Sequence, residues 1–368
     1  MNKLIPNPQL NYIASYKPGK SIDEVKKELG IKDVIKLASN ENPFGTSIKV
    51  FKAITDYFYN IHRYPDPHCI KLKNVLSEKL NILKDEIIIG NGSDEIIEMI
   101  FKAYIGKEDE ILTCFPTFQY YKIAASQTFG EFREIPLKEY KFDIQGLLSS
   151  INKNTKIIIL CNPNNPTGTY IDSKSLKNFI KELPERILLI IDEAYFEFFE
   201  KDKIVDGVKF IKLFPEKNII ILRTFSKIYG LASLRLGYGI SKIEIIENLN
   251  KVRQPFNVNG VAQVAGIAAL EDEDFFIKTY ENNLKCKKIL YNFFEKLNVF
   301  YLPSQANFIF FDPKIDNDLI FNELLKRGVI IRSLKSFGYE TALRVSIGNE
   351  KEINLFLENF EKVYYNLK

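Results

Sequence analysis

The stretch that decides the fold is DEIIIGNGSDEIIEMIFKAYIGKEDEILTCF, residues Asp85 to Phe115. It opens with a short apolar run, EIIIG, continues with the amphipathic segment SDEIIEMIFKAY, and closes with a second apolar run, DEILTCF. Short apolar runs rich in β-branched residues that alternate with amphipathic segments are typical of strands followed by helices. The stretch therefore predicts βα units.

The same alternation continues toward the C-terminus. An amphipathic stretch runs from Phe118 to Phe129, and later segments predict three further strands and a helix: Lys156 to Cys161, Ile187 to Asp192, Asn218 to Thr224, and a helix near Ser173 to Leu183. Strands that are apolar on both faces belong to a sheet covered by helices on both sides. We therefore predict an α/β fold whose large domain holds a mostly parallel sheet flanked by helices.

The pattern changes after Asn259. Two long helices are expected at Asn259 to Leu270 and Asp274 to Leu297, followed by strands in ANFIFF, VIIR and ALRVSI and a terminal helix after Glu350. A chain of 368 residues exceeds the size at which a single core stops growing. We expect an N-terminal arm (1–30), a large domain (31–255) and a smaller α+β domain (256–368).

Charge and cysteine usage exclude several classes of protein. The 51 basic and 47 acidic residues are interspersed, which argues against a nucleic-acid or membrane-surface patch. The chain has four widely separated cysteines without a CxxC pair, a pattern that fits neither a disulfide framework nor a zinc ribbon and favours the reducing cytoplasm. No uncharged apolar run reaches eighteen residues, so we expect neither secretion nor membrane insertion. The spacing of His62, His68 and Cys69 does not fit zinc, and no metal site is predicted.

Polar residues follow nearly every predicted strand, at the sheet edge where α/β proteins bind ligands. After EIIIG, Ser93 and Asp94 open a helix whose free backbone N–H groups can hold a phosphate, although an ordinary helix cap is the alternative. Gly90 and Gly92 lack the third glycine of a dinucleotide-binding loop. After DEILTCF, Phe118 could lie against a flat cofactor or belong to the core.

Two later strand ends carry an amide and a carboxylate. The loop Cys161 to Gly168 is dense in turn-forming residues and presents the side-chain amide of Asn165. The next strand ends in Asp192, with the phenol of Tyr195 three residues on. Asp192 is a candidate site carboxylate, and a plain helix cap is the alternative.

A lysine follows the next strand. Lys227 stands between Thr224-Phe225-Ser226 and a glycine-containing apolar sequence, where removal from water would lower its pKa and make it an amine nucleophile and base. Most lysines are simply solvated, so Lys227 alone would be weak evidence. Arg235, eight residues on, could pair with a dianionic phosphate.

Together these segments resemble the fold-type I pyridoxal-phosphate enzymes of the aspartate aminotransferase superfamily, along nearly the whole chain. Within it, the chain is most similar to the histidinol-phosphate aminotransferase family, among the class II aminotransferases. The motifs that carry the resemblance are, in order, NENPFG (Asn40 to Gly45), RYPDP (Arg63 to Pro67), NGSDE, CNPNNPTG, DEAY, TFSKIYGLASLRLGYG, RQPFNVN (Arg253 to Asn259), ANF, GVIIRS and LRVSIG.

The resemblance implies a role for each candidate residue. Lys227 matches the lysine that holds pyridoxal 5'-phosphate as a Schiff base, Asp192 the carboxylate paired with its pyridine nitrogen, and Asn165 and Tyr195 the groups bonded to its ring oxygen. Lys227, Asp192 and Tyr195 are the implied catalytic residues. The groups implied to hold the cofactor's phosphate are the backbone of Ser93 and Asp94, with Ser226, Arg235 and, from the second subunit of a homodimer, Tyr64. Phe118 stands where the family commonly has a stacking tyrosine.

The substrate end rests on two arginines. Arg332 and Arg344 are twelve residues apart, and two guanidiniums suit a phosphate better than a single carboxylate. In the resembled family the matching arginines, with a tyrosine matching Tyr16, bind the substrate phosphate, and Asn165 also lies at the substrate. The alternative reading makes Arg332 a surface ion pair.

The implied reaction interconverts L-histidinol phosphate and 2-oxoglutarate with imidazole-acetol phosphate and L-glutamate, in histidine biosynthesis. Alternatives within the superfamily are an aromatic amino-acid aminotransferase and a phosphothreonine decarboxylase. A non-catalytic regulator on the same fold is a further alternative. Such regulators carry an added N-terminal DNA-binding domain, whereas only a short arm precedes NENPFG here, so we expect an enzyme.

Overall fold

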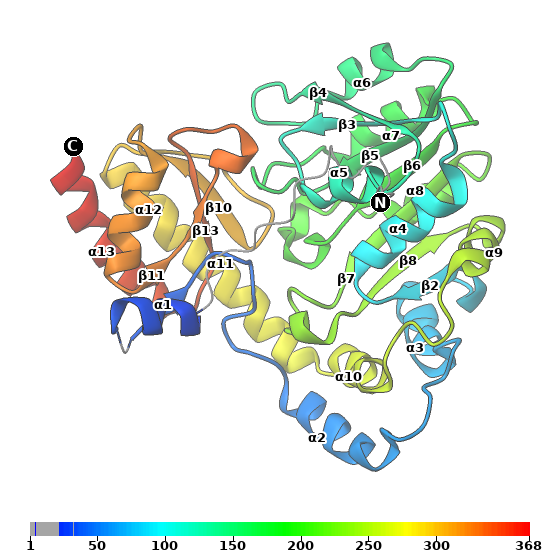
Figure 1. Cartoon of the computed structure of the whole chain (residues 1–368), viewed down its shortest axis with the longest axis horizontal. Helices are drawn as coiled ribbons and strands as arrows, with labels where there is room; N and C mark the ends of the chain where they lie inside the picture. Colours follow the sequence, from blue (N-terminus) through cyan, green and yellow to red (C-terminus); the bar gives the residue numbers. More distant parts are fainter. Residues whose placement is uncertain (1–3, 5–21, 32) are drawn as a thin grey trace.

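The computed structural model describes residue 4 and residues 22–31 and 33–368 (Figure 1). A seven-stranded sheet forms the centre of the larger part, in the order β2-β8-β7-β6-β5-β3-β4. Its strands are β2 (Ile87–Gly90), β3 (Glu110–Phe115), β4 (Glu131–Pro136), β5 (Thr155–Cys161), β6 (Leu188–Asp192), β7 (Asn218–Thr224) and β8 (Gly237–Ser241). Only β8 runs antiparallel to its neighbours, β2 and β7. The predicted mostly parallel sheet is confirmed.

Apolar strands and amphipathic helices build the core of this part. Nearly every residue of β5 and β6 is buried, as expected for strands covered on both faces. The helices around the sheet are α2 (Ile48–Tyr57), α3 (Ile70–Leu80), α4 (Ser93–Tyr104), α5 (Tyr120–Ala125), α6 (Ile144–Ser150), α7 (Ser173–Glu182), α8 (Gly207–Leu213), α9 (Ile243–Val252) and α10 (Gly260–Leu270). Short 3-10 turns join them: η2 (Phe58–Asn60), η3 (Lys84–Glu86), η4 (Phe196–Phe198), η5 (Lys201–Lys203) and η6 (Ala232–Leu234).

A smaller antiparallel sheet, ordered β12-β13-β10-β9, lies on the other side of the molecule (Figure 1). Its strands are β9 (Phe300–Tyr301), β10 (Phe308–Asp312), β12 (Arg332–Ser333) and β13 (Leu343–Ser346), and its helices and turn are α11 (Glu273–Lys296), α12 (Asn317–Lys326), η7 (Lys335–Phe337) and α13 (Glu350–Leu367). Aromatic side chains fill the space between this sheet and its helices, and the rings of Phe294 and Phe311 stack with centroids 4.7 Å apart. This is the predicted α+β arrangement.

The segment expected to be an arm ends in ordered structure. Helix α1 (Ile22–Leu29) buries Val25 against Leu325 and Ile330. The next strand, β1 (Ile35–Lys36), pairs in parallel with β11 (Val329–Ile330). These two strands form a separate two-stranded sheet, and the residues that follow β1, Ala38 to Asn40, line a cavity with residues of both larger sheets.

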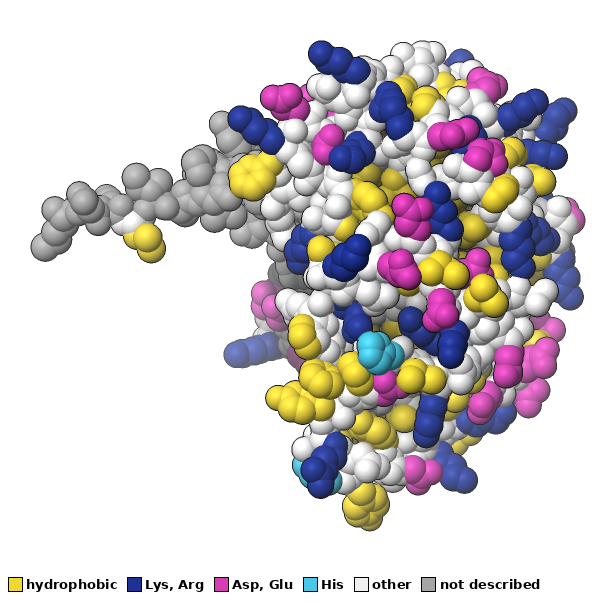
Figure 2. Space-filling view, turned by 90° about the vertical axis from the view of Figure 1, so that its right-hand side faces the viewer, with side chains coloured by type: hydrophobic (Ala, Val, Ile, Leu, Met, Phe, Trp, Pro, Cys, Tyr) yellow, Lys and Arg dark blue, Asp and Glu magenta, His cyan; other side chains and the backbone are white. Residues whose placement is uncertain are grey.

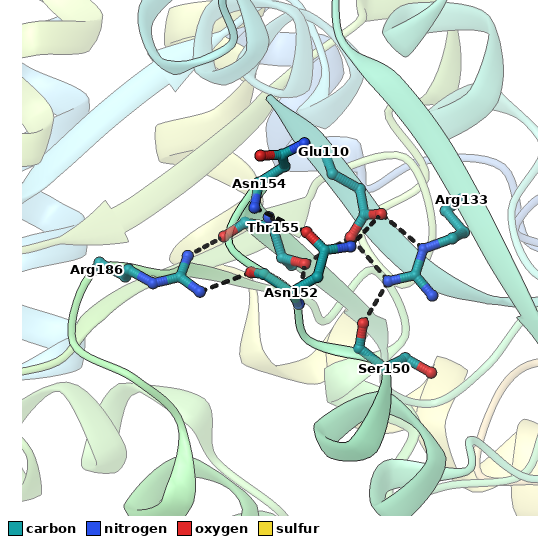
Figure 3. A network of polar contacts seen from close by, with 7 residues as sticks. All are labelled: Glu110, Arg133, Ser150, Asn152, Asn154, Thr155 and Arg186. Carbon is teal, nitrogen blue, oxygen red and sulfur yellow. Dashed lines mark hydrogen bonds and ion pairs between the residues drawn. The ribbon is translucent and has the colours of Figure 1, made fainter. Parts of the chain in front are cut away.

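A polar network ties the large sheet together at the amino ends of its strands (Figure 3). The buried carboxylate of Glu110, at the start of β3, accepts two hydrogen bonds from the guanidinium of Arg133, at 2.6 and 2.9 Å. It also accepts hydrogen bonds from Thr155 and Asn152. Ligands bind such sheets at the carboxyl ends of the strands, so this network lies at the structural end of the sheet.

The surface shows no large field of one charge on the face seen in Figure 2, where basic and acidic side chains are interspersed. Among residues 22–31 and 33–368, no helix is both long and apolar enough to cross a membrane.

Candidate active site

Eleven of the predicted site residues line one cavity of about 210 Å³. It opens at the carboxyl ends of the large sheet's strands, where the small sheet contributes its arginines. The eleven residues are Ser93, Asp94, Phe118, Asn165, Asp192, Tyr195, Ser226, Lys227, Arg235, Arg332 and Arg344. The structure therefore brings together side chains that are spread over some 250 positions of sequence.

Lys227 follows β7 after two intervening residues, Phe225 and Ser226, and lines this cavity. Its Nζ lies 3.3 Å from the carbonyl oxygen of Ser39 and 5.8 Å from the centre of the Tyr195 ring. Burial, with the positive charge of Arg344 nearby, lowers the pKa of the Lys227 ammonium to about 8. The lowered pKa increases the uncharged share of the amine near neutral pH, and the uncharged amine is the form that acts as a nucleophile.

Asp192 ends β6 and lies at the buried side of the cavity. Its Oδ2 accepts a hydrogen bond of 2.6 Å from the phenol of Tyr121, and its Oδ1 accepts one of 3.0 Å from the backbone N–H of Ala194. Burial raises the pKa of the Asp192 carboxyl to about 6, against these two hydrogen bonds, which lower it. At neutral pH Asp192 is therefore mostly ionised although it is buried.

The start of α4 and Arg235 form a cradle for an anion. The Nη2 of Arg235 lies 2.9 Å from Oδ2 of Asp94, and Arg235 itself adopts the left-handed conformation with φ +52°. Gly92 has φ +84°, and a Cβ there would lie 2.8 Å from that Nη2, so a side chain would displace the guanidinium. Free N–H groups at a helix start and a guanidinium are the groups that bind phosphate.

Asn165 and Tyr195 are each held so that a donor stays available to the cavity. The Oδ1 of Asn165 accepts a hydrogen bond from Arg344, which leaves the Nδ2 of the amide free to donate. The hydroxyl of Tyr195 accepts a hydrogen bond of 2.9 Å from Nδ2 of Asn40, which leaves its own proton free to donate. Asn40 is fixed in turn by Ser346 and Asn307.

The two arginines differ in their surroundings. Arg344, on β13, is buried, and its Nη2 donates a hydrogen bond of 2.7 Å to the carbonyl oxygen of Ala38. Arg332, on β12, is half-buried and lines the cavity. Within the described part of the chain no carboxylate forms an ion pair with Arg332.

Two predicted aromatic residues lie in different places, one at the cavity and one outside it. The ring of Phe118 lies at the cavity and packs edge-on against Tyr121, with centroids 5.4 Å apart. Tyr64 lies outside the cavity, is 83% exposed, and stacks on Phe256 with ring centroids 4.6 Å apart. Tyr16 lies outside the described residues.

Sequence reasoning missed two residues that hold the site. Tyr121 donates a hydrogen bond to Asp192 and Asn40 donates one to Tyr195, and neither residue is among the predicted site residues. Asn40 stands in the quoted motif NENPFG, so its place in that motif was an available signal. Tyr121 stands in an amphipathic stretch where its spacing predicts only a core residue.

The comparisons with known proteins agree with this geometry. The model of the family "Aminotransferase class I and II" matches residues 32–360. The chain belongs to this aminotransferase family. A histidinol-phosphate aminotransferase of Moorella thermoacetica is 44% identical over 351 residues, 95% of this chain and 91% of that protein. One of Caldicellulosiruptor saccharolyticus is also 44% identical, over 95% of this chain and 98% of that protein.

Solved structures of aminotransferases share the fold. The histidinol-phosphate aminotransferase of Sinorhizobium meliloti, crystallised in complex with pyridoxal-5'-phosphate, superposes with a TM-score of 0.89 at 25% identity and covers 98% of both chains. An aspartate aminotransferase mutant of Thermus thermophilus gives a TM-score of 0.80 at 21% identity. The predicted fold-type I architecture of the aminotransferase family is confirmed.

Proposed function

We propose that this chain is a pyridoxal-phosphate-dependent aminotransferase that interconverts L-histidinol phosphate and 2-oxoglutarate with imidazole-acetol phosphate and L-glutamate, in histidine biosynthesis. The observation that carries the proposal is that one cavity holds the amine of Lys227, the carboxylate of Asp192 and the guanidiniums of Arg332 and Arg344. The relatives that are 44% identical carry the same name.

The cavity fits the cofactor that this activity needs. Lys227 supplies the amine that would anchor it, Asp192 a carboxylate for its ring nitrogen, and Arg235 with Ser226 and the start of α4 a cradle for its phosphate. When bound, pyridoxal phosphate supplies a protonated ring into which the electrons left at the substrate's amino-bearing carbon can spread.

The protein's own groups then have defined tasks. The negative charge of Asp192 keeps the ring nitrogen protonated. The amine of Lys227 would remove the proton from the amino-bearing carbon of the substrate and return it as an acid. The lowered pKa of Lys227 suits both steps, because a group that acts first as a base and then as an acid is most effective when its pKa lies near the working pH. Asn165 and Tyr195, whose donors stay available, would bind the ring oxygen of the cofactor.

Arg332 and Arg344 favour a phosphorylated substrate over a plain aromatic amino acid. A phosphate can accept from two guanidiniums, whereas one arginine suffices for the carboxylate of glutamate. Arg344 is fixed in place by Asn165 and Ala38, and Arg332 adds the second charge. With Tyr16, these residues would form the substrate phosphate site.

The protein would act as a cytoplasmic homodimer with composite active sites. Several large apolar side chains on and near α2 and η2 are exposed: Ile48, Phe51, Phe58, Tyr59, Ile61 and Tyr64. Figure 2 shows hydrophobic side chains gathered in the lower part of the molecule, where Figure 1 places α2. Several large apolar side chains exposed on neighbouring elements are typical of a protein interface. A second copy that covered it could receive Tyr64 at its cofactor phosphate.

Reconstitution tests the proposed activity. The protein loaded with pyridoxal phosphate should convert histidinol phosphate and 2-oxoglutarate to imidazole-acetol phosphate and glutamate, and borohydride should trap the cofactor on the peptide that contains Lys227. Trapping on another lysine would refute the assigned site. With phosphothreonine as the only amine, release of carbon dioxide, together with no glutamate formed from histidinol phosphate, would favour the decarboxylase alternative.

A further inference from the structure

The phenol of Tyr121 is placed against the carboxylate that the proposed chemistry depends on. Tyr121 belongs to α5, is completely buried, and donates to Oδ2 of Asp192 over 2.6 Å. This distance lies in the range of charge-assisted O–H···O hydrogen bonds. Since the Ala194 N–H binds the other oxygen, Asp192 is held at both oxygens and its plane is fixed.

Each Asp192 oxygen keeps a further lone pair. An ionised carboxylate offers about four acceptor positions, of which two are used by the phenol and the Ala194 N–H. The remaining positions can accept a proton donor from the cavity, which Asp192 lines. The Tyr121 hydrogen bond therefore orients the carboxylate without blocking it.

Tyr121 is itself held rigidly. Its ring packs edge-on against Phe118, with an interplanar angle of 86°. The loop that leads to α5 is tied to the loop of Asn165, because Thr117 donates a 2.8 Å hydrogen bond to Oδ1 of Asn164. The phenol thus cannot swing away from Asp192 without disturbing the walls of the cavity.

We infer that Tyr121 is a positioning residue that acts on the cofactor through Asp192, by keeping this carboxylate ionised and aimed at the cofactor's ring nitrogen. The inference rests on the proposed role of Asp192. A buried tyrosine with a purely structural task would need only some acceptor, and a backbone carbonyl would serve. Here the acceptor is the site's carboxylate, whose charged form the phenol stabilises against the effect of burial.

The test compares two cofactors on the apoenzyme. Pyridoxal phosphate and its analogue with C–H in place of the ring nitrogen are titrated into wild type, Tyr121→Phe and Asp192→Asn. Both variants should lower the affinity for pyridoxal phosphate by about tenfold or more, in line with the loss of one charge-assisted hydrogen bond. The affinity for the analogue should stay nearly unchanged. Tyr364→Phe, which removes a buried phenol of the small domain, should change neither affinity.

The proposed role of Asp192 and the inferred role of Tyr121 fail on different outcomes. If Asp192→Asn does not discriminate between the cofactors, the proposed role of Asp192 is wrong. The inference about Tyr121 is wrong if Asp192→Asn lowers only the affinity for pyridoxal phosphate while Tyr121→Phe changes neither affinity. It is also wrong if Tyr121→Phe lowers the affinity for both cofactors equally. The double variant Tyr121→Phe/Asp192→Asn leaves no unpaired charge, and it should equal Asp192→Asn alone for both cofactors. A further loss in the double variant would also overturn the inference, even if Tyr121→Phe alone failed to fold.

Discussion

Arg332 and Arg344 lie directly opposite each other on the neighbouring antiparallel strands β12 and β13. Both side chains line the cavity that holds Lys227. Two like charges at adjacent strand positions repel each other, so the pair costs stability unless an anion joins it. A ligand with two or more negative oxygens would relieve this repulsion.

Truncating the two arginines should separate the two substrates. Arg332→Ala should raise KM for histidinol phosphate about tenfold or more, because it removes charge-assisted hydrogen bonds worth roughly 1.5–3 kcal/mol. The KM for glutamate should change little, since one arginine can bind its carboxylate with both nitrogens. Arg344→Ala should raise KM for both substrates. Steady-state kinetics with each substrate measures these effects.

An exposed arginine of the same domain provides the control. Arg327→Ala, at the end of α12, removes an equal charge away from the cavity and should leave both KM values unchanged. If Arg332→Ala raised KM equally for glutamate and histidinol phosphate, the proposal that Arg332 and Arg344 together bind the substrate phosphate would be refuted.

The low pKa of Lys227 predicts a pH-dependent cost in stability. The folded protein releases the Lys227 proton near pH 8, whereas the unfolded chain keeps it to about pH 10.5. The unfolded state binds more protons at Lys227 in this window, so the contribution of Lys227 to the free energy of unfolding should rise with pH from about 8 to 10.5. The apoenzyme of Lys227→Met should be more stable than wild type at pH 7, and the difference should shrink toward pH 10.

Urea unfolding of both apoenzymes at pH 7, 8.5 and 10 measures this difference. A gap that stays constant over the whole range would show that Lys227 is not desolvated in the folded protein.

Mixing two inactive variants tests the composite active site. Lys227→Ala lacks the amine and Tyr64→Ala lacks the side chain proposed to reach the other subunit's cofactor, so a mixed dimer holds one complete site. After exchange of subunits, activity should recover to about a quarter of wild type, because half of the dimers are mixed and each has one intact site. A mixture of Lys227→Ala with Asp192→Asn should recover nothing if Lys227 and Asp192 serve the same site, because neither mixed site then holds both residues. Full activity of Tyr64→Ala by itself would speak against the composite site.

The Glu110 network should matter for stability and not for catalysis. Although burial opposes it, hydrogen bonds from Arg133, Thr155 and Asn152 hold the pKa of the Glu110 carboxyl below its usual value. Glu110→Gln should lower the free energy of unfolding by about 1–3 kcal/mol, because a buried partner loses its acceptor. The kcat/KM of the holoenzyme should stay near wild type, since the network lies at the amino ends of the strands (Figure 3). A large loss of kcat/KM with unchanged stability would contradict this assignment.

The strand ends explain why much of the site could be predicted. Asn165, Asp192 and Lys227 each follow an apolar run, and parallel strands bring their carboxyl ends to one edge. Strands β4 and β8 are not among the predicted strands. The sequence of β4, EFREIP, is charged and half-exposed, and the sequence of β8, GYGIS, contains two glycines, so neither reads as an apolar run. The expected helical stretch from Phe118 to Phe129 is also shorter in the structure, where α5 spans six residues.

Hydrogen bonds between distant side chains could not be predicted. Asn40 and Tyr195 are 155 positions apart, and Tyr121 and Asp192 are 71 apart. Spacing along the chain specifies which face of a helix a tyrosine occupies, but not which acceptor lies opposite it in the fold. The domain boundaries after residues 30 and 255 and the roles of the individual site residues stay predictions.

The substrate preference tests the central claim most directly. The holoenzyme's kcat/KM is measured with 2-oxoglutarate and, in turn, histidinol phosphate, histidinol, phenylalanine and tyrosine. We predict that histidinol phosphate exceeds every other amino donor by about tenfold or more, as expected when two guanidiniums bind its phosphate. A holoenzyme that prefers phenylalanine or tyrosine over histidinol phosphate would contradict the proposed substrate.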